Sequence, residues 1–163
     1  MSDDGTTSGT RTPAVRVSTA RSERGQAAVE FGLVVPFICG LVLALVHFGK
    51  AMNYWLDLNH VAAEGARKAA VNAFPSAAQY QDYLRDHLET AELKAGGSES
   101  VPAGAEIAIC LPEGGDIGKP VTVRVSVGYH WIPFIGATTW TIRGSATMRL
   151  EQDASFSAIG TCT

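Results

Sequence analysis

The amino-acid sequence predicts an α+β fold with a long N-terminal helix, a second amphipathic helix and a three-stranded antiparallel sheet. Three patterns support this prediction: an apolar block at residues 26–49, a helical spacing of apolar residues beyond that block, and an alternation of apolar and polar residues after Gly97. We expect the first half of the long helix to span a membrane and its second half to be extracytoplasmic.

The apolar block at residues 26–49 is long enough to cross a bilayer. As a helix it would extend about 36 Å, at about 1.5 Å per residue, against a hydrocarbon core of roughly 30 Å. No charged residue occurs from Phe31 to Val46. A buried core helix rarely runs so far without charge, and the bulky residues after Val46 do not form the cleavage site of a removed secretory signal. The block therefore predicts a retained transmembrane helix, with the membrane as a partner.

Basic residues predict the orientation of this helix. Only Lys50 lies in the window after the block, whereas four arginines precede it: Arg11, Arg16, Arg21 and Arg24. The positive-inside rule then places the N-terminus in the cytoplasm. The predicted organisation is a disordered basic leader at residues 1–25, a transmembrane helix at residues 26–49 and an extracytoplasmic α+β domain at residues 50–163. The chain is thus expected to be a single-pass protein of the cytoplasmic membrane.

Helical spacing predicts that the first helix continues to about residue 73, before Pro75. Pro36 lies inside this helix, which membrane helices tolerate. Ser76 and Gln79 form a capping box that predicts the start of a second helix, and the glycine pair at residues 96–97 predicts its end.

Beyond Gly97 the apolar period changes from that of a helix to that of a strand. Alternation predicts strands at about residues 105–111, 121–128 and 142–150, with prolines and glycines in the connections. Each strand has one apolar face, and that face needs a cover. The outer half of the first helix and the second helix are the candidates.

Three cysteines occur in the chain. Cys39 lies in the apolar block and is expected to behave as a small hydrophobe. Cys110 and Cys162 lie in the outer part, where an oxidising exterior permits a disulfide; it would close a loop of about 50 residues and stabilise the fold by about 4 kcal/mol. Two unpaired thiols are the alternative. The histidines show no ligand spacing with these cysteines, so we expect no metal and no cofactor.

Two groups of aromatic residues have alternative interpretations. Tyr54 and Trp55 follow the apolar block, where they either anchor the chain in the membrane interface or pack against the outer domain. The segment Tyr129–Gly136 is rich in large apolar side chains. It forms either a contact surface for a neighbouring subunit or the bilayer, or a loop that folds back on the core.

The sequence gives no support for catalysis or for nucleic-acid binding. The formal net charge is −3, which does not favour nucleic acid as a partner. No serine lies in a nucleophile elbow, no glycine-rich phosphate loop follows a predicted strand, and no acidic pair marks a site. We therefore predict that the chain is not an enzyme.

Glu30 is the unusual residue of the apolar block. A carboxylate at the centre of a membrane helix costs roughly 2.5–3.5 kcal/mol, and less toward the end. Intramembrane acids therefore usually have a partner and a function. Glu30 is either a tolerated acid near the end of a membrane helix or a functional group of the run Arg24-Gly25-Gln26-Ala27-Ala28-Val29-Glu30-Phe31.

A basic leader, a glycine, four residues, Glu30-Phe31 and a long apolar helix together resemble the N-terminus of a type IV prepilin. By that resemblance a prepilin peptidase cuts between Gly25 and Gln26, and Glu30 becomes the fifth residue of the mature chain. The resemblance assigns Glu30 and Phe31 to assembly. The new amine at Gln26 and the Glu30 carboxylate of the same or a neighbouring chain would neutralise each other in a medium of low dielectric.

Further segments resemble one family, the TadE-like proteins, which are pseudopilins or minor pilins of tight-adherence (Flp) pilus systems. The likeness is close over about residues 24–74 and loose over 119–151, and Lys50 stands where an arginine is more familiar. The segments that carry this likeness are Val35-Pro36, His47-Phe48-Gly49-Lys50, Ala62-Ala63-Glu64-Gly65-Ala66-Arg67-Lys68-Ala69-Ala70 and Ser145-Ala146-Thr147-Met148-Arg149-Leu150-Glu151.

The resemblance implies a non-enzymatic minor pilin with a type IV pilin-like fold. Its implied partners are a prepilin peptidase, other pilin or pseudopilin subunits and the pilus assembly platform, and its implied place is the membrane or the pilus at the cell surface. The alternative is a single-pass membrane protein whose outer domain binds an envelope ligand or partner and has no pilus role.

Overall fold

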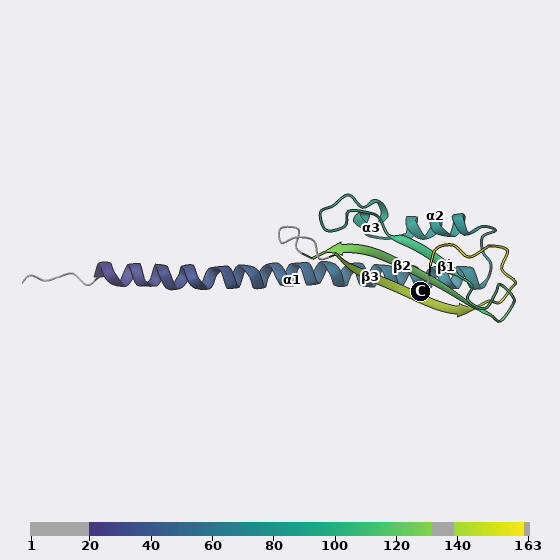
Figure 1. The fold of residues 1–163 in the computed structure, drawn as a ribbon, viewed down its shortest axis with the longest axis horizontal. Helices are drawn as coiled ribbons and strands as arrows, with labels where there is room; N and C mark the ends of the chain where they lie inside the picture. The colour runs from purple at the N-terminus through teal and green to yellow at the C-terminus, as the bar shows by residue number, and fades with distance from the viewer. Residues whose placement is uncertain (1–19, 132–138, 162–163) are drawn as a thin grey trace, which may run out of the picture. The chain divides into compact units, whose positions relative to one another are not determined.

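A computed structural model describes residues 20–131 and 139–161 of the chain (Figure 1). It contains a long helix, two short helices and a three-stranded sheet, which confirms the predicted α+β fold. In chain order the elements are α1 Ala20–Ala70, α2 Ala77–His87, α3 Ala91–Ala95, β1 Glu106–Cys110, β2 Pro120–His130 and β3 Thr139–Arg149. The chain divides into two compact units, the first ending at Val42 and the second beginning at Leu43. We call them the apolar unit and the α+β unit.

Helix α1 contains 51 residues and continues through Pro36. Within the described residues it is the one helix long and apolar enough to cross a membrane, and none of these residues buries its most apolar stretch. This helix begins at Ala20, six residues before the predicted start at residue 26, so that its first turn precedes Gly25. Its C-terminal part belongs to the α+β unit.

The sheet has the strand order β1-β2-β3, and both pairs are antiparallel. Alternate residues of the central strand β2 are buried, as the sequence pattern predicts; these are Val121, Val123, Val125, Val127 and Tyr129. Val123 lies opposite Ile109 of β1 and Ala146 of β3, which fixes the register. The other face is more polar and includes a 2.8 Å contact between the Thr122 and Thr147 hydroxyls.

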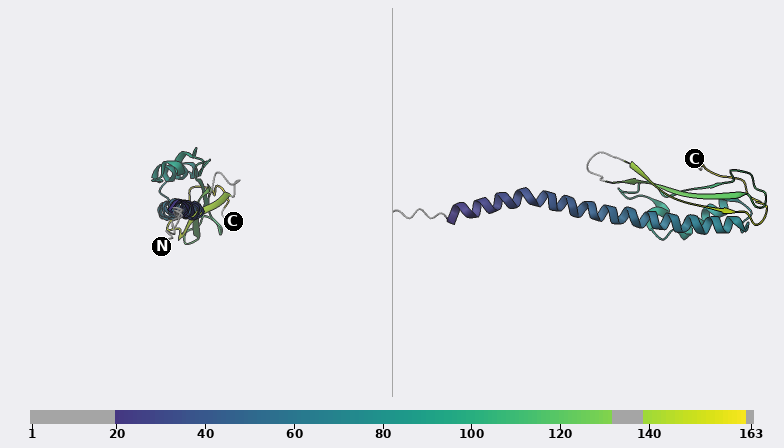
Figure 2. Two further views of the ribbon diagram at one scale, coloured as in Figure 1. Left: turned by 90° about the vertical axis from the view of Figure 1, so that its left-hand side faces the viewer. Right: turned by 90° about the horizontal axis from the view of Figure 1, so that it is seen from below.

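The C-terminal part of α1 and helix α2 cover the apolar face of the sheet, as expected (Figure 2). Glycines make this close packing possible. A Cβ atom at Gly65 of α1 would lie 2.8 Å from Leu84 of α2 and 3.1 Å from Val123 of β2. A Cβ atom at Gly144 of β3 would collide with the backbone of Leu58 in α1. The α1 backbone therefore lies directly against β3, without a side chain between them.

The predicted second helix is interrupted, and the prediction of one helix up to Gly96 is wrong. Ser76 caps its start as expected and accepts a hydrogen bond from the Gln79 amide at 3.4 Å. The helix ends at His87, Leu88 has extended backbone angles, and α3 starts only at Ala91. The reason lies on another element, because a carboxylate of α1 binds the chain at the break.

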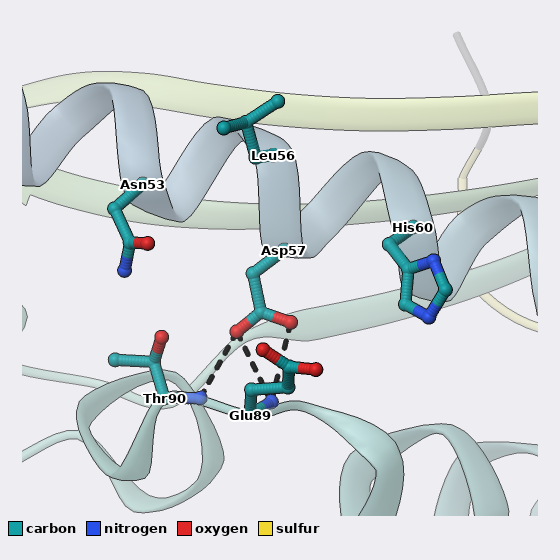
Figure 3. A pocket seen from close by; sticks show the side chains of 6 residues that line it. All are labelled: Asn53, Leu56, Asp57, His60, Glu89 and Thr90. Carbon is teal, nitrogen blue, oxygen red and sulfur yellow. Dashed lines mark hydrogen bonds between the residues drawn. The ribbon is translucent and has the colours of Figure 1, made fainter.

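Asp57 of α1 is that carboxylate, and its side chain is turned toward the segment between α2 and α3 (Figure 3). One of its oxygens accepts from the Thr90 amide at 3.0 Å, and both lie 3.2 Å from the Glu89 amide. Continuing α2 would direct these N–H groups to carbonyls of its own preceding turn. Asp57 is only 8% exposed. Asp57 is therefore an acid of the outer domain that lies in the protein interior and not on a solvated face.

We predict that Asp57→Ala destabilises the α+β unit by about 1.5–3 kcal/mol, the range for hydrogen bonds to a charged group. Asp57→Asn should lose less, because its side-chain oxygen still accepts one of the two amides. Chemical unfolding of the detergent-solubilised protein, with hydrogen exchange at Glu89 and Thr90, measures both effects.

His60→Ala is the matched control, because His60 lies one turn further along the same helix and is exposed. It should leave stability and both exchange rates unchanged. Unaltered protection of the two amides in Asp57→Ala would contradict the assignment of Asp57 as the cap.

Candidate processing and assembly site

Gly25 and Gln26 lie inside α1, five residues after its first residue Ala20. A glycine inside a helix destabilises it by about 1 kcal/mol relative to alanine, so its presence usually has a packing or functional reason. A Cβ atom placed at Gly25 has no described atom within 4 Å. Packing among the described residues therefore does not require a glycine here, and the same holds for Gly32, Gly40 and Gly49 of this helix.

Glu30 lies one helical turn after Gln26, so their side chains are neighbours on the surface of α1. The Gln26 side-chain amide donates a hydrogen bond to the Glu30 carboxylate at 3.1 Å, one turn away. Both residues are exposed. The structure therefore brings together two of the predicted site residues, and gives the acid a neutral donor.

Phe31 and the residues that follow form an uncovered apolar surface. Phe31 itself is 69% exposed. The surface continues along α1 through large exposed side chains: Leu33, Val34, Phe37, Ile38, Leu41, Val42, Leu43, Leu45, Val46 and Phe48. A soluble protein rarely exposes so much contiguous apolar area, so these side chains need lipid or other helices as neighbours.

This apolar surface extends beyond the first charged residue, Lys50. Met52, Trp55 and Leu56 are exposed at spacings of three and four residues along α1. Trp55 is 44% exposed, whereas its neighbour Tyr54 is buried in the core. Of the two interpretations of this aromatic pair, packing holds for Tyr54, and Trp55 stays available for an external partner.

Tyr54 and Lys50 connect α1 to the short helix α3. The Tyr54 hydroxyl donates to the Glu92 carboxylate, and the Lys50 amine lies 3.7 Å from the same side chain. Each of the two charged side chains is about a third or more exposed, so the pair contributes little by itself. The pair shows where the uncharged part of α1 ends, because Lys50 is the first charged residue after Phe31.

Tyr129 connects the end of β2 to α1 at His47. Its hydroxyl lies 3.0 Å from the His47 ring Nδ1 and 3.3 Å from the His47 carbonyl oxygen. Burial raises the pKa of the Tyr129 hydroxyl above its ordinary value; the nearby Lys50 charge opposes this and the Glu92 charge adds to it. The hydroxyl therefore remains protonated at neutral pH and can donate. Tyr129 is part of the core, whereas residues 132–136 of the predicted contact segment lie outside the described residues.

A shallow groove of about 320 Å³ lies between α1 and the segment before α3 (Figure 3). Six residues line it: Asn53, Leu56, Asp57, His60, Glu89 and Thr90. Its buried acid, Asp57, already accepts backbone hydrogen bonds, so the groove offers no unpaired carboxylate at its base. Among the described residues no cluster of histidine, cysteine, aspartate or glutamate is arranged to bind a metal ion.

The predicted cysteine pair is described only in part. Cys110 is the last residue of β1 and is half-buried, while Cys162 lies outside the described residues. Sequence reasoning missed the Asp57 cap and the contact between His47 and Tyr129. Neither has a local signal, because their partners are more than thirty and eighty residues away in sequence.

Comparison with protein families gives one match. The family model described as TadE-like protein matches residues 25–67, about a quarter of the chain. This confirms the resemblance to TadE-like proteins over the segment from Gly25 into the alanine-rich part of α1. The match relates this segment to a Tad pilus-associated family. No protein of curated function and no solved structure matches the sequence.

Proposed function

We propose that this chain is a non-enzymatic TadE-like minor pilin, or pseudopilin, that acts in assembly of the tight-adherence (Flp) pilus. The observation that carries the proposal is an uncharged, exposed apolar surface of α1 that begins at Phe31, directly after Glu30. Glu30 in turn follows Gly25 by five residues, and packing among the described residues does not require a glycine there. The family match begins at this glycine.

In the proposed topology, residues 1–25 are a cytoplasmic leader and residues 26–49 cross the cytoplasmic membrane. Residues 50–163 then form the extracytoplasmic domain. A prepilin peptidase removes the leader between Gly25 and Gln26. The partners are other pilin or pseudopilin subunits and the assembly platform, which the exposed apolar face of α1 would contact within the membrane and for two turns beyond it.

Cleavage would change the electrostatic surroundings of Glu30. In the described chain Glu30 lies ten residues into α1, far from the helix start. After cleavage the helix would start at Gln26, with a charged amine and unsatisfied N–H groups one turn from the carboxylate. An amine and a carboxylate stabilise each other strongly in a low-dielectric bundle, where either alone is costly. The same pairing is available between neighbouring chains.

We predict that co-expression with the matching prepilin peptidase yields a membrane form whose first residue is Gln26. Gly25→Val should prevent this processing, because the peptidase must accommodate the residue before the cut. Intact mass and N-terminal sequencing measure the outcome.

Gly32→Val is the matched control, because Gly32 is also helical and has no described atom within 4 Å of an added Cβ. It should be processed like the wild type. A wild-type protein that keeps residues 1–25 beside an active peptidase would argue against the proposal and favour a single-pass protein with an envelope ligand.

We predict that Glu30→Gln leaves membrane insertion intact and impairs assembly. Removing one member of a buried charge pair typically costs about 3–5 kcal/mol, which corresponds to a loss of about a hundredfold or more in association. Quantitative co-purification of tagged subunits from membranes measures the association.

Glu151→Gln removes the same charge from an exposed position of the α+β unit and should have no effect. Equal recovery of partner subunits with Glu30→Gln and with the wild type would show that the acid is merely tolerated.

We also propose a disulfide between Cys110 and Cys162. The C-terminal tail already lies on β1: Ile109 and Ile159 exchange two backbone hydrogen bonds of 2.8 Å, and a Cβ atom at Gly160 would lie 2.7 Å from the Cβ of Ala108. Cys162 follows Gly160 by two residues, which is within the reach of an extended chain.

We predict that alkylation of the unreduced, denatured protein labels only Cys39, and that reduction exposes all three cysteines. Cys110→Ser should destabilise the α+β unit by about 4 kcal/mol in the chain-entropy treatment. Cys39→Ser, in the apolar unit, is the control and should leave that stability unchanged. Labelling of three cysteines before reduction would contradict the pairing.

A further inference from the structure

The end of the sheet where β2 finishes and β3 begins carries a pair of tryptophans, one half-buried and one exposed. Trp131 follows β2, and Trp140 lies in β3 opposite Tyr129. The two indole rings are 6.2 Å apart, and Trp131 lies 6.3 Å from the His47 ring. Trp131 is half-buried, whereas Trp140 is 61% exposed. We call Trp131 and Trp140 the indole pair.

The position of this pair along α1 is fixed by Tyr129. The Tyr129 hydroxyl contacts both the ring and the carbonyl of His47. His47 precedes Lys50, the first charged residue after the uncharged run, by three residues or about 4.5 Å of helix. The indole pair therefore lies level with the last turn of the apolar block.

Charged groups lie just beyond this level. The Lys50 amine and the Glu92 carboxylate are 3.7 Å apart and both partly exposed. Going outward along α1, the order is an apolar helix, then the indole pair with His47, then an ion pair. A membrane interface has the same order, with hydrocarbon followed by amphipathic aromatic rings and then charged headgroups.

We infer that the indole pair is inserted in the phospholipid headgroup region of the outer leaflet and holds the sheet against the membrane surface. The inference rests on the membrane topology under the proposed function. An indole suits this layer because its ring is apolar while its N–H can donate to a phosphate or carbonyl oxygen. The ligand is thus the glycerophospholipid interface, and a second copy of the chain is the competing occupant.

The full-length protein is reconstituted in phosphatidylcholine vesicles, with lipids brominated near the headgroup as fluorescence quenchers. The protein contains three tryptophans, so Trp55→Phe with Trp131→Phe leaves Trp140 as the emitter. Its emission should be blue-shifted relative to an indole in water and should be lower in brominated vesicles than in unbrominated ones, as expected for an interfacial aromatic ring.

Trp131→Phe with Trp140→Phe is the matched control and leaves Trp55 as the emitter. Trp55 lies eight residues, or about 12 Å, further out along α1 than His47. Its emission should respond to aqueous iodide and be unaffected by brominated lipid. If the double substitutions fail to fold, Trp140→Phe alone should reduce the quenching seen with the wild type.

Several outcomes overturn the inference. Trp140 emission that iodide quenches and brominated lipid does not would place the indole in water. Emission shielded from both quenchers, and dependent on the ratio of protein to lipid, would show a protein neighbour. A protein that does not float with vesicles contradicts the membrane topology itself, whereas a protein that floats and lacks quenching contradicts only this inference.

Discussion

The structure depends on one constraint, which is that a single helix must satisfy two different surroundings. Helix α1 is continuous from Ala20 to Ala70. From Phe31 to Phe48 it carries large, apolar, exposed side chains, while many of its side chains from Tyr54 onward are buried in a packed protein core. Because the backbone hydrogen bonds of a helix are internal, the same conformation is stable in lipid and in a protein core. Only the side chains need to change, from exposed apolar ones to ones that pack in the core, and this change occurs within two turns between Phe48 and Tyr54.

Along α1 the side chains change in size as well as in polarity. Residues of α1 that face the sheet are mostly small, and the fully buried ones include Ala62, Ala66 and Ala69. Small side chains and Gly65 allow helix, sheet and α2 to meet closely, and Gly144 allows β3 to touch the α1 backbone. The segment matched by the TadE-like family spans both parts, from Gly25 to Arg67. It therefore combines the proposed processing site with the surface on which the sheet is built.

Local sequence patterns predicted the elements whose stability is local. Periods of 3.6 and 2 gave α1, α2 and the three strands, and Ser76 gave the start of α2. The end of α2 could not be predicted, because it is determined by Asp57 on another helix. The burial of Tyr129 likewise could not be predicted from local sequence, because its hydroxyl contacts His47, which is far away in the chain. In the sequence alone, Asp57 and His47 resemble ordinary exposed polar residues. Their partners become neighbours only when the helices and the sheet pack together.

Two acids of α1, Glu30 and Asp57, show how the chain treats a carboxylate near apolar surroundings. Asp57 is buried, and the fold supplies two backbone N–H groups to it, because an unpaired buried charge is costly. Glu30 lies at the start of the more apolar surface and has one neutral amide donor, from Gln26. Its outward position becomes costly only when lipid or neighbouring helices surround it. Under the proposed function, a positive charge created at Gln26 would be the partner of the Glu30 carboxylate, as the two backbone N–H groups are the partners of Asp57. Assembly would then be the physical reason for keeping this acid.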